Sequence, residues 1–156
     1  MDADNAAPDR EDAEMTIARM MRGRDGDVVA VQVDTTVRAV VALLAERRIG
    51  AVPVMDGDRV VGILSERDLV HCLAAEGAAV IDRTAESVMT APPITVTGDM
   101  PVLAALSLMT RRRIRHLPVM EGERMVGFVS IGDLVKHRID GIEAEAAALR
   151  DYISAG

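Results

Sequence analysis

Short apolar runs and longer amphipathic stretches alternate along this chain in an order that predicts its secondary structure. Apolar side chains at helical spacing predict a helix from Thr36 to Arg47, with Asp34 as the candidate for its N-terminal cap. Two short strands, Val52–Met55 and Arg59–Leu64, flank a glycine between acidic residues, which is typical of a hairpin. A second helix is predicted from Glu66 onward.

The same order occurs a second time. Residues 34–70 and 99–135 align without a gap at an offset of 65 positions, so that Asp34 recurs as Asp99. A β-rich stretch precedes each copy, at Val28–Val33 and from Ile94, and Pro101 falls in the first turn of the second copy's first helix. An ungapped repeat means one β-α-β-β-α unit used twice. Because one unit is too small to bury a good core, we expect the two to pack face to face as one α/β domain with pseudo-two-fold symmetry.

These patterns divide the chain into four predicted segments. A short helix opens each unit, at Thr16–Arg22 and Ala85–Thr90. The first fourteen residues are polar and acidic, which favours a flexible tail. The predicted boundaries are a tail at 1–14, a first unit at 15–80, a second unit at 81–140 and a C-terminal helix extension at 141–156.

The last helix continues well past the repeat. From Ile131 it carries an apolar stripe, formed by Leu134, Val135, Ile139, Ile142, Ala146, Leu149 and Tyr152. Such a stripe predicts either a surface for a partner or a helix that folds back on its own domain, and Gly141 is able to break the helix in both cases. We expect a homodimer that includes this helix.

Composition narrows the class of protein. The chain of 156 residues is 49% hydrophobic but has one Phe, one Tyr and no Trp, so its core is aliphatic. A net charge of −7 argues against nucleic-acid binding, and no apolar run approaches the roughly 20 residues that span a bilayer. A single cysteine, Cys72, and an N-terminus without a signal or transit pattern suit a reducing cytoplasm.

One motif in each unit carries candidate chemistry. It reads Gly-h-h-Ser-x-x-Asp, where h is hydrophobic, and it comprises Gly62, Ser65 and Asp68 in the first unit and Gly127, Ser130 and Asp133 in the second. Its spacing favours a helix capping box, in which serine and aspartate satisfy backbone N–H groups. The same geometry also suits a nucleotide, because a helix N-terminus binds phosphate and a carboxylate accepts from a ribose diol. The glycines are expected to let a ligand approach the strand backbone.

The repeat resembles the CBS domain, and the pair resembles a Bateman module. The resemblance rests on the β-α-β-β-α order, on Pro-Val-Met after the first helix, on the glycine before the last strand and on the Ser-x-x-Asp that opens the last helix. It covers about residues 15–140, and the flanking segments look like small stand-alone CBS-pair proteins of bacteria and plant organelles. The resemblance implies two units that pack through their sheets and leave two clefts for adenosyl ligands: AMP, ADP, ATP, NAD(H) or S-adenosylmethionine.

The resemblance also implies roles for individual residues. Asp68 and Asp133 are expected to hold ribose, and Ser65 and Ser130 to contact phosphate. The base pocket is expected to be lined by the backbone around Val52, Pro53, Leu117 and Pro118, with Val31 and Val96 near the adenine. Arg115 and His116 are expected to reach phosphate; the first unit has Gly50 and Ala51 in their places, which predicts one well-equipped site and one that is weaker or favours a different ligand.

These features favour a regulatory protein over an enzyme. The sequence offers no nucleophile–base pair and no Walker loop, and it gives little reason to expect a metal site or a required cofactor. The leading hypothesis is a sensor of adenine nucleotides or NAD(H) that signals energy or redox state to an unidentified protein. The alternatives are an S-adenosylmethionine sensor, which a cationic Arg115 disfavours, and an interaction scaffold that needs no ligand.

Overall fold

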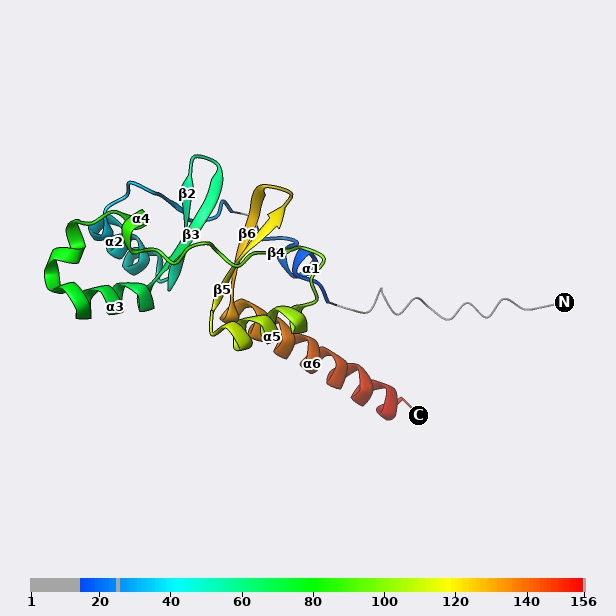
Figure 1. Cartoon of the computed structure of the whole chain (residues 1–156). Coiled ribbons are helices and arrows are strands. Elements are labelled where there is room, and N and C mark those ends of the chain that lie inside the picture. The colour runs from blue at the N-terminus through cyan, green and yellow to red at the C-terminus, as the bar shows by residue number, and fades with distance from the viewer. Residues whose placement is uncertain (1–14, 25, 156) are drawn as a thin grey trace.

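A computed structural model describes residues 15–24 and 26–155 and has a mixed α/β architecture with two three-stranded sheets (Figure 1). The first half of the chain forms α1 (Ile17–Met21), β1 (Val31–Gln32), α2 (Val37–Arg47), β2 (Ala51–Asp56), β3 (Arg59–Ser65), α3 (Glu66–Glu76) and the 3₁₀ helix η2 (Gly77–Asp82). The second half forms α4 (Ala85–Val88), β4 (Val96–Thr97), α5 (Val102–Arg112), β5 (His116–Glu121), β6 (Arg124–Ser130) and α6 (Ile131–Ser154). The predicted acidic tail at 1–14 lies outside the described residues.

The two sheets repeat each other in strand order and in register. In the first, β1 runs parallel to β2 and β2 pairs antiparallel with β3; β4, β5 and β6 repeat this arrangement. Val31 pairs with Val54 and Val96 with Val119, at the offset of 65 that separates the two copies. The hairpin turns are also equivalent, since Gly57 and Gly122 both adopt a φ of 61° that favours glycine. β3 and β6 lie next to each other at the centre of the molecule, and the helices cover the outer sides (Figure 1).

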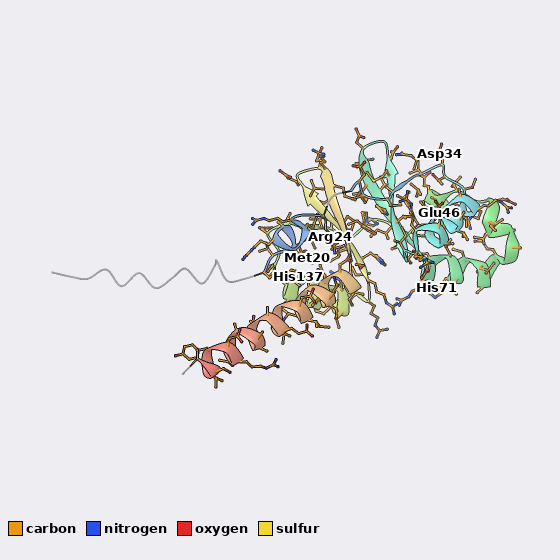
Figure 2. The ribbon with its side chains drawn as sticks, turned by 180° about the vertical axis from the view of Figure 1, so that it is seen from behind. Met20, Arg24, Asp34, Glu46, His71 and His137 are labelled. Atoms are coloured by element: carbon orange, nitrogen blue, oxygen red, sulfur yellow. The ribbon has the colours of Figure 1, made fainter. Side chains whose placement is uncertain are left out.

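The helix N-termini differ in detail from the prediction. Asp34 lies on the loop before α2 and does not cap it (Figure 2). The cap is Thr36, whose hydroxyl accepts from the Ala39 backbone N–H at 3.2 Å. Pro101 is the N-cap of α5, one position before the predicted first turn, and it makes no side-chain cap. Asp34 fails as a cap because it stands two residues too early.

The leading helices are exchanged between the two units. Ile17 and Met20 of α1 belong to the core that the second unit builds around Leu117 and Val129. In the same way, Ala85 and Val88 of α4 pack in the core of the first unit. Backbone hydrogen bonds fix the exchange; for example, Ile17 donates to the Met100 carbonyl at 2.9 Å. The chain therefore ties the two units together through two exchanged helices.

The C-terminal helix α6 runs without interruption through Gly141 to Ser154, so the possible break at this glycine does not occur. Its C-terminal half extends away from both sheets and does not fold back on them (Figure 1). Across residues 15–24 and 26–155, no helix combines the length and the apolar character needed to cross a membrane.

Candidate functional site

Two clefts lie between the units, one on each side of the pseudo-two-fold axis. We name them by the motif aspartate that each contains. The Asp68 cleft has a volume of about 300 Å³ and is lined by Gly50, Ile63, Ser65, Glu66, Arg67, Asp68, Thr90, Pro92, Pro93, Ile94, Arg113, Ile114, Arg115 and His116. The Asp133 cleft has about 600 Å³ and is lined by Met21, Arg24, Gly26, Asp27, Val28, Val29, Arg48, Ile49, Gly50, Ala51, His116, Val126, Gly127, Phe128, Ser130 and Asp133. Both volumes fall in the range of small-molecule sites.

In the Asp68 cleft, the motif carboxylate is held at the start of α3. Oδ2 of Asp68 accepts from the backbone N–H and from the hydroxyl of Ser65, both at 2.8 Å. The Asp68 backbone N–H donates back to the Ser65 hydroxyl at 3.3 Å, which completes a capping box. The second oxygen, Oδ1, accepts from the Thr90 hydroxyl at 2.9 Å. Oδ1 is thus positioned by a neutral donor, and it is the oxygen that a ligand hydroxyl can take over.

Arginines from both units line the Asp68 cleft. Arg113 ends α5 in a left-handed conformation with a φ of 55°, a position where glycine is common, and Arg115 follows two residues later. Arg67 from α3 donates to the Arg113 carbonyl at 3.2 Å and so bridges the two units. With Glu66 and Asp68 as the only acidic lining residues, the lining carries one more cation than anion. This cleft is therefore suited to an anionic group.

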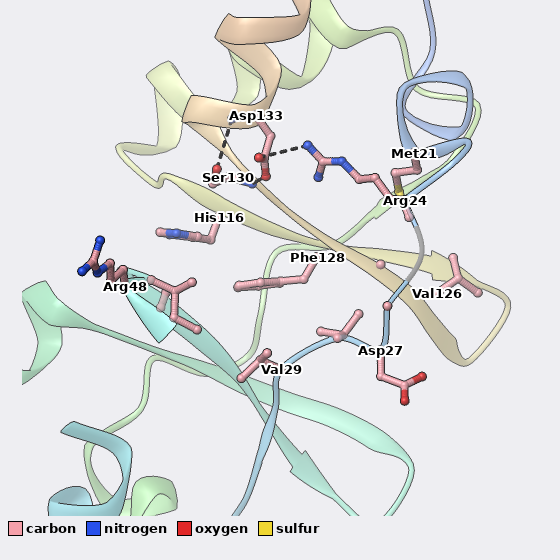
Figure 3. A pocket seen from close by; sticks show the side chains of 16 residues that line it. Met21, Arg24, Asp27, Val29, Arg48, His116, Val126, Phe128, Ser130 and Asp133 are labelled. Atoms are coloured by element: carbon pink, nitrogen blue, oxygen red, sulfur yellow. Dashed lines mark hydrogen bonds and ion pairs between the residues drawn. The ribbon is translucent and has the colours of Figure 1, made fainter. Parts of the chain in front are cut away.

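The Asp133 cleft has the same cap but a different partner for the carboxylate (Figure 3). Oδ2 of Asp133 accepts from the Ser130 backbone N–H at 2.8 Å, whereas Oδ1 forms an ion pair with Arg24 at 3.0 Å. Burial raises the pKa of Asp133, but the hydrogen bonds from Arg24 and Ser130 outweigh it and hold this pKa below its usual value of 3.8. Both oxygens of this carboxylate are thus engaged, one of them by a cation.

His116 lines both clefts. Its ring stacks on Phe128, the single phenylalanine of the chain, with centroids 5.5 Å apart and an interplanar angle of 13° (Figure 3). Burial lowers the pKa of His116 below its usual value of 6.5; Asp133 acts against this shift, Arg115 adds to it, and Glu66 opposes it. The imidazole is therefore neutral at pH 7 and gains a proton more readily when an anion lies beside it.

The structure brings together some of the predicted site residues. Ser65, Asp68 and Arg115 line one cleft, Ser130, Asp133 and Gly127 line the other, and His116 lines both. Seven predicted residues do not line either cleft: Val31, Val52, Pro53, Gly62, Val96, Leu117 and Pro118. Apart from Gly62, these seven contribute buried side chains to the two cores. Val29 and Ile94, which stand two positions before the predicted valines, line the clefts instead.

The space beside each motif glycine is occupied by a neighbouring side chain. A Cβ on Gly62 would collide with the Sδ of Met89 and lie 2.9 Å from the Thr90 carbonyl oxygen. A Cβ on Gly127 would likewise collide with the Met21 side chain. A methionine at the end of each leading helix therefore occupies the space beside each glycine, so a ligand that approaches either strand backbone has to displace a methionine side chain.

The lining residues that were not predicted as part of a site include Arg24, Arg48, Thr90 and Arg113. For Arg48 and Arg113 a signal exists in the repeat, because both copies keep an arginine at the helix end where a left-handed residue is needed. Arg24 precedes the first copy of the ungapped repeat and Thr90 lies between the two copies, so the repeat gives no signal for either residue.

Comparisons with known proteins agree with this architecture. A family model described as the CBS domain matches residues 16–75 and 85–140. The mitochondrial CBS domain-containing protein CBSX3 of Arabidopsis thaliana is 33% identical over 150 residues, which cover 90% of this chain and 73% of that protein. A crystal structure of a CBS-domain containing protein from Agrobacterium tumefaciens matches with a TM-score of 0.76 and 34% identity, covering 80% of this chain and 99% of that one. A CBS domain protein from Pyrobaculum aerophilum, complexed with AMP, matches with a TM-score of 0.67 and 28% identity, covering 76% of this chain and 89% of that one.

Proposed function

The chain belongs to the CBS-domain family, and from this premise we propose that it is a regulatory module that binds an adenine nucleotide in the Asp68 cleft. The ligand class comprises AMP, ADP, ATP and NAD(H), which share an adenosine and at least one phosphate. The observation that carries the proposal is the combination, in the lining of one cleft, of a carboxylate that accepts from a hydroxyl and of the arginines Arg67, Arg113 and Arg115. The AMP complex of the similar Pyrobaculum aerophilum protein supports this ligand class.

Each part of such a ligand meets matching chemistry in the Asp68 cleft. The ribose diol donates to Asp68 Oδ1 in place of the Thr90 hydroxyl. The phosphate lies against Arg115, because guanidinium groups bind phosphate oxygens through charge-assisted hydrogen bonds. The adenine lies against the aliphatic side chains of Ile63 and Ile94, which take the place of the predicted Val31 and Val96. S-Adenosylmethionine is disfavoured, because its sulfonium cation would lie among these arginines.

The Asp133 cleft is the weaker nucleotide site in this proposal. Its carboxylate is already paired with Arg24, so a ribose has to displace a cation and not a neutral hydroxyl. Its lining cations, Arg24 and Arg48, are balanced by Asp27 and Asp133. The difference supports the expectation of one well-equipped cleft and one that favours a different ligand.

The proposed output is regulation of another protein and not catalysis. CBS pairs of this kind are typically regulatory. A nucleotide bound between the two units changes how strongly they associate with each other. Arg67 lines the Asp68 cleft and already bridges the units, so the bound phosphate alters an existing contact. We place this activity in a reducing cytoplasm and assign it to a homodimer.

Isothermal titration calorimetry with AMP and with adenosine tests the proposal. A charged hydrogen bond is worth about 1.5–3 kcal/mol, so Arg115→Ala should weaken AMP roughly ten- to hundredfold and leave adenosine nearly unchanged. Arg112→Ala is the matched control, because Arg112 is exposed at the end of α5 and lines neither cleft. Equal losses for both ligands would show that Arg115 does not contact phosphate, and the absence of any binding at millimolar AMP, ATP and NADH would refute the sensor function.

A further inference from the structure

The C-terminal half of α6 presents an apolar stripe that nothing in the described part of the chain covers. Ile139 and Ile142 are 49% and 48% exposed, and Leu149 and Ile153 are 60% and 69% exposed. The helix contacts its own domain by the adjoining side, where His137, Arg138, Gly141 and Glu145 line a groove next to the start of α5. A stripe of this size on a helix that extends away from the molecule marks an interaction surface (Figure 2).

The spacing of the stripe is that of a coiled coil. Its positions alternate steps of four and three residues: Val135, Ile139, Ile142, Ala146, Leu149 and Ile153. Such a repeat of 3.5 residues keeps one seam facing a partner helix along its whole length. In heptad notation Ile139, Ala146 and Ile153 occupy a positions, and Val135, Ile142 and Leu149 occupy d positions. Isoleucine at a with leucine at d, as at Ile153 and Leu149, favours two strands.

The charged residues that flank the stripe identify the partner. Arg138 and Glu145 occupy g positions, and Glu143 and Arg150 occupy e positions. In a parallel pair, each g residue faces the e residue five positions later on the other helix. Arg138 then meets the partner's Glu143, Glu145 meets the partner's Arg150, and symmetry doubles both pairs. None of the ion pairs found within residues 15–24 and 26–155 uses these side chains, so all four remain available.

We propose that α6 forms a parallel, two-stranded coiled coil with α6 of a second copy of this chain. The inference rests on the homodimer proposed above and adds its contact surface and the orientation of its subunits. An antiparallel overlap of the whole stripe is disfavoured, because it sets Glu143 against Glu143 and Glu145 against Glu145. The flanking charges therefore favour α6 of a second copy as the partner helix, and they favour the parallel orientation.

Reversing the flanking charges tests whether the partner is a second copy of α6. Light scattering and sedimentation should show that the full-length wild-type chain is a dimer at tens of micromolar. Glu143→Lys with Glu145→Lys makes all four flanking positions basic, and Arg138→Glu with Arg150→Glu makes them all acidic. Each double variant alone should dimerise at least about tenfold more weakly, and a mixture of the two should recover a heterodimer. Asp140→Lys with Asp151→Lys is the matched control on the opposite side of α6, and it should dimerise like the wild type.

Cross-linking through one introduced cysteine tests whether the two helices run parallel. In a Cys72→Ser background, Ile153→Cys should form an intermolecular disulfide on mild oxidation, because equivalent a positions face each other only in a parallel pair. Ala147→Cys, on the outward side of the helix, should not. A monomeric wild type, charge variants that dimerise undiminished, or an Ile153→Cys chain that does not cross-link would each overturn the proposal. Ligand binding is measured separately by calorimetry, so failure of the coiled coil and failure of the nucleotide site are distinguishable.

Discussion

Replacing each motif aspartate by asparagine separates the capping role of the carboxylate from its proposed role in ligand binding. Asparagine keeps one carbonyl oxygen, which can still accept from the Ser65 backbone N–H as Asp68 Oδ2 does now at 2.8 Å. Its amide group faces Thr90, whose hydroxyl can turn to accept a hydrogen bond. Asp68→Asn therefore preserves most of the cap and removes the negative charge.

The structure sets different stability costs for the two variants. Loss of a negative charge at a helix N-terminus costs about 0.3–1 kcal/mol, which applies to Asp68→Asn and Asp133→Asn alike. Asp133→Asn also loses the ion pair with Arg24; because the two side chains are 47% and 32% exposed, this pair adds only about 0.2–1 kcal/mol. At roughly 2–4 °C per kcal/mol, Asp133→Asn should lower Tm by about 0.4–4 °C more than Asp68→Asn.

Ligand affinity should follow the opposite order. Asp68→Asn weakens acceptance from two ribose hydroxyls, and charged hydrogen bonds of about 1.5–3 kcal/mol predict at least a tenfold loss for both AMP and adenosine. Asp133→Asn should leave this binding event nearly unchanged. Thermal melts and calorimetry on the same preparations measure both quantities. The reasoning fails if Asp133→Asn weakens AMP more than Asp68→Asn does, or if Asp68→Asn loses more than about 2 kcal/mol of stability with no change in affinity.

Three further predictions concern pH, packing and assembly. The pKa of His116 in the folded chain lies below 6.5, so the unfolded chain binds a proton at this residue first as the pH falls. The contribution of His116 to stability should therefore be complete above pH 6.5 and decrease as the pH drops towards the lowered pKa. Denaturant titrations should show that His116→Gln loses this pH dependence. Gly62→Ala should cost about 1–3 kcal/mol through its collision with Met89, whereas Gly141→Ala, with open space around it, should raise Tm. A chain that ends at Arg138 should keep its fold and remain monomeric by light scattering.

The local structure was predictable because each of its signals lies within a few residues. The local pattern predicted each α-helix of the described residues and both hairpins, although not the 3₁₀ helix η2, and the Ser-x-x-Asp motifs form capping boxes in both units. The exchange of α1 and α4 between the units was not predictable, because Ile17 packs near Leu117, a hundred residues away. Neither apolar spacing nor capping chemistry carries information over such a separation.

The candidate site was predictable only in part, for physical reasons that differ between residues. The run from Val28 to Val33 is apolar at five of six positions and does not alternate, so it does not reveal which valines face a cleft. Val31 pairs with Val54 inside the sheet, and Val29 lines the cleft. Arg24 reaches Asp133 from a loop that has no counterpart in the repeat, and only the folded arrangement shows this contact.

The duplicated motif does not by itself make two equal sites. Ser65 and Ser130 hold Asp68 and Asp133 in the same way, so the repeated residues fix the position of each carboxylate. The remaining oxygen takes its partner from a segment outside the ungapped repeat: a neutral hydroxyl for Asp68 and a guanidinium for Asp133. A hydroxyl leaves the negative charge available to a sugar, whereas a cation neutralises it. Because these connecting segments can change without loss of either cap, ligand preference is able to diverge between the clefts while the fold stays symmetric.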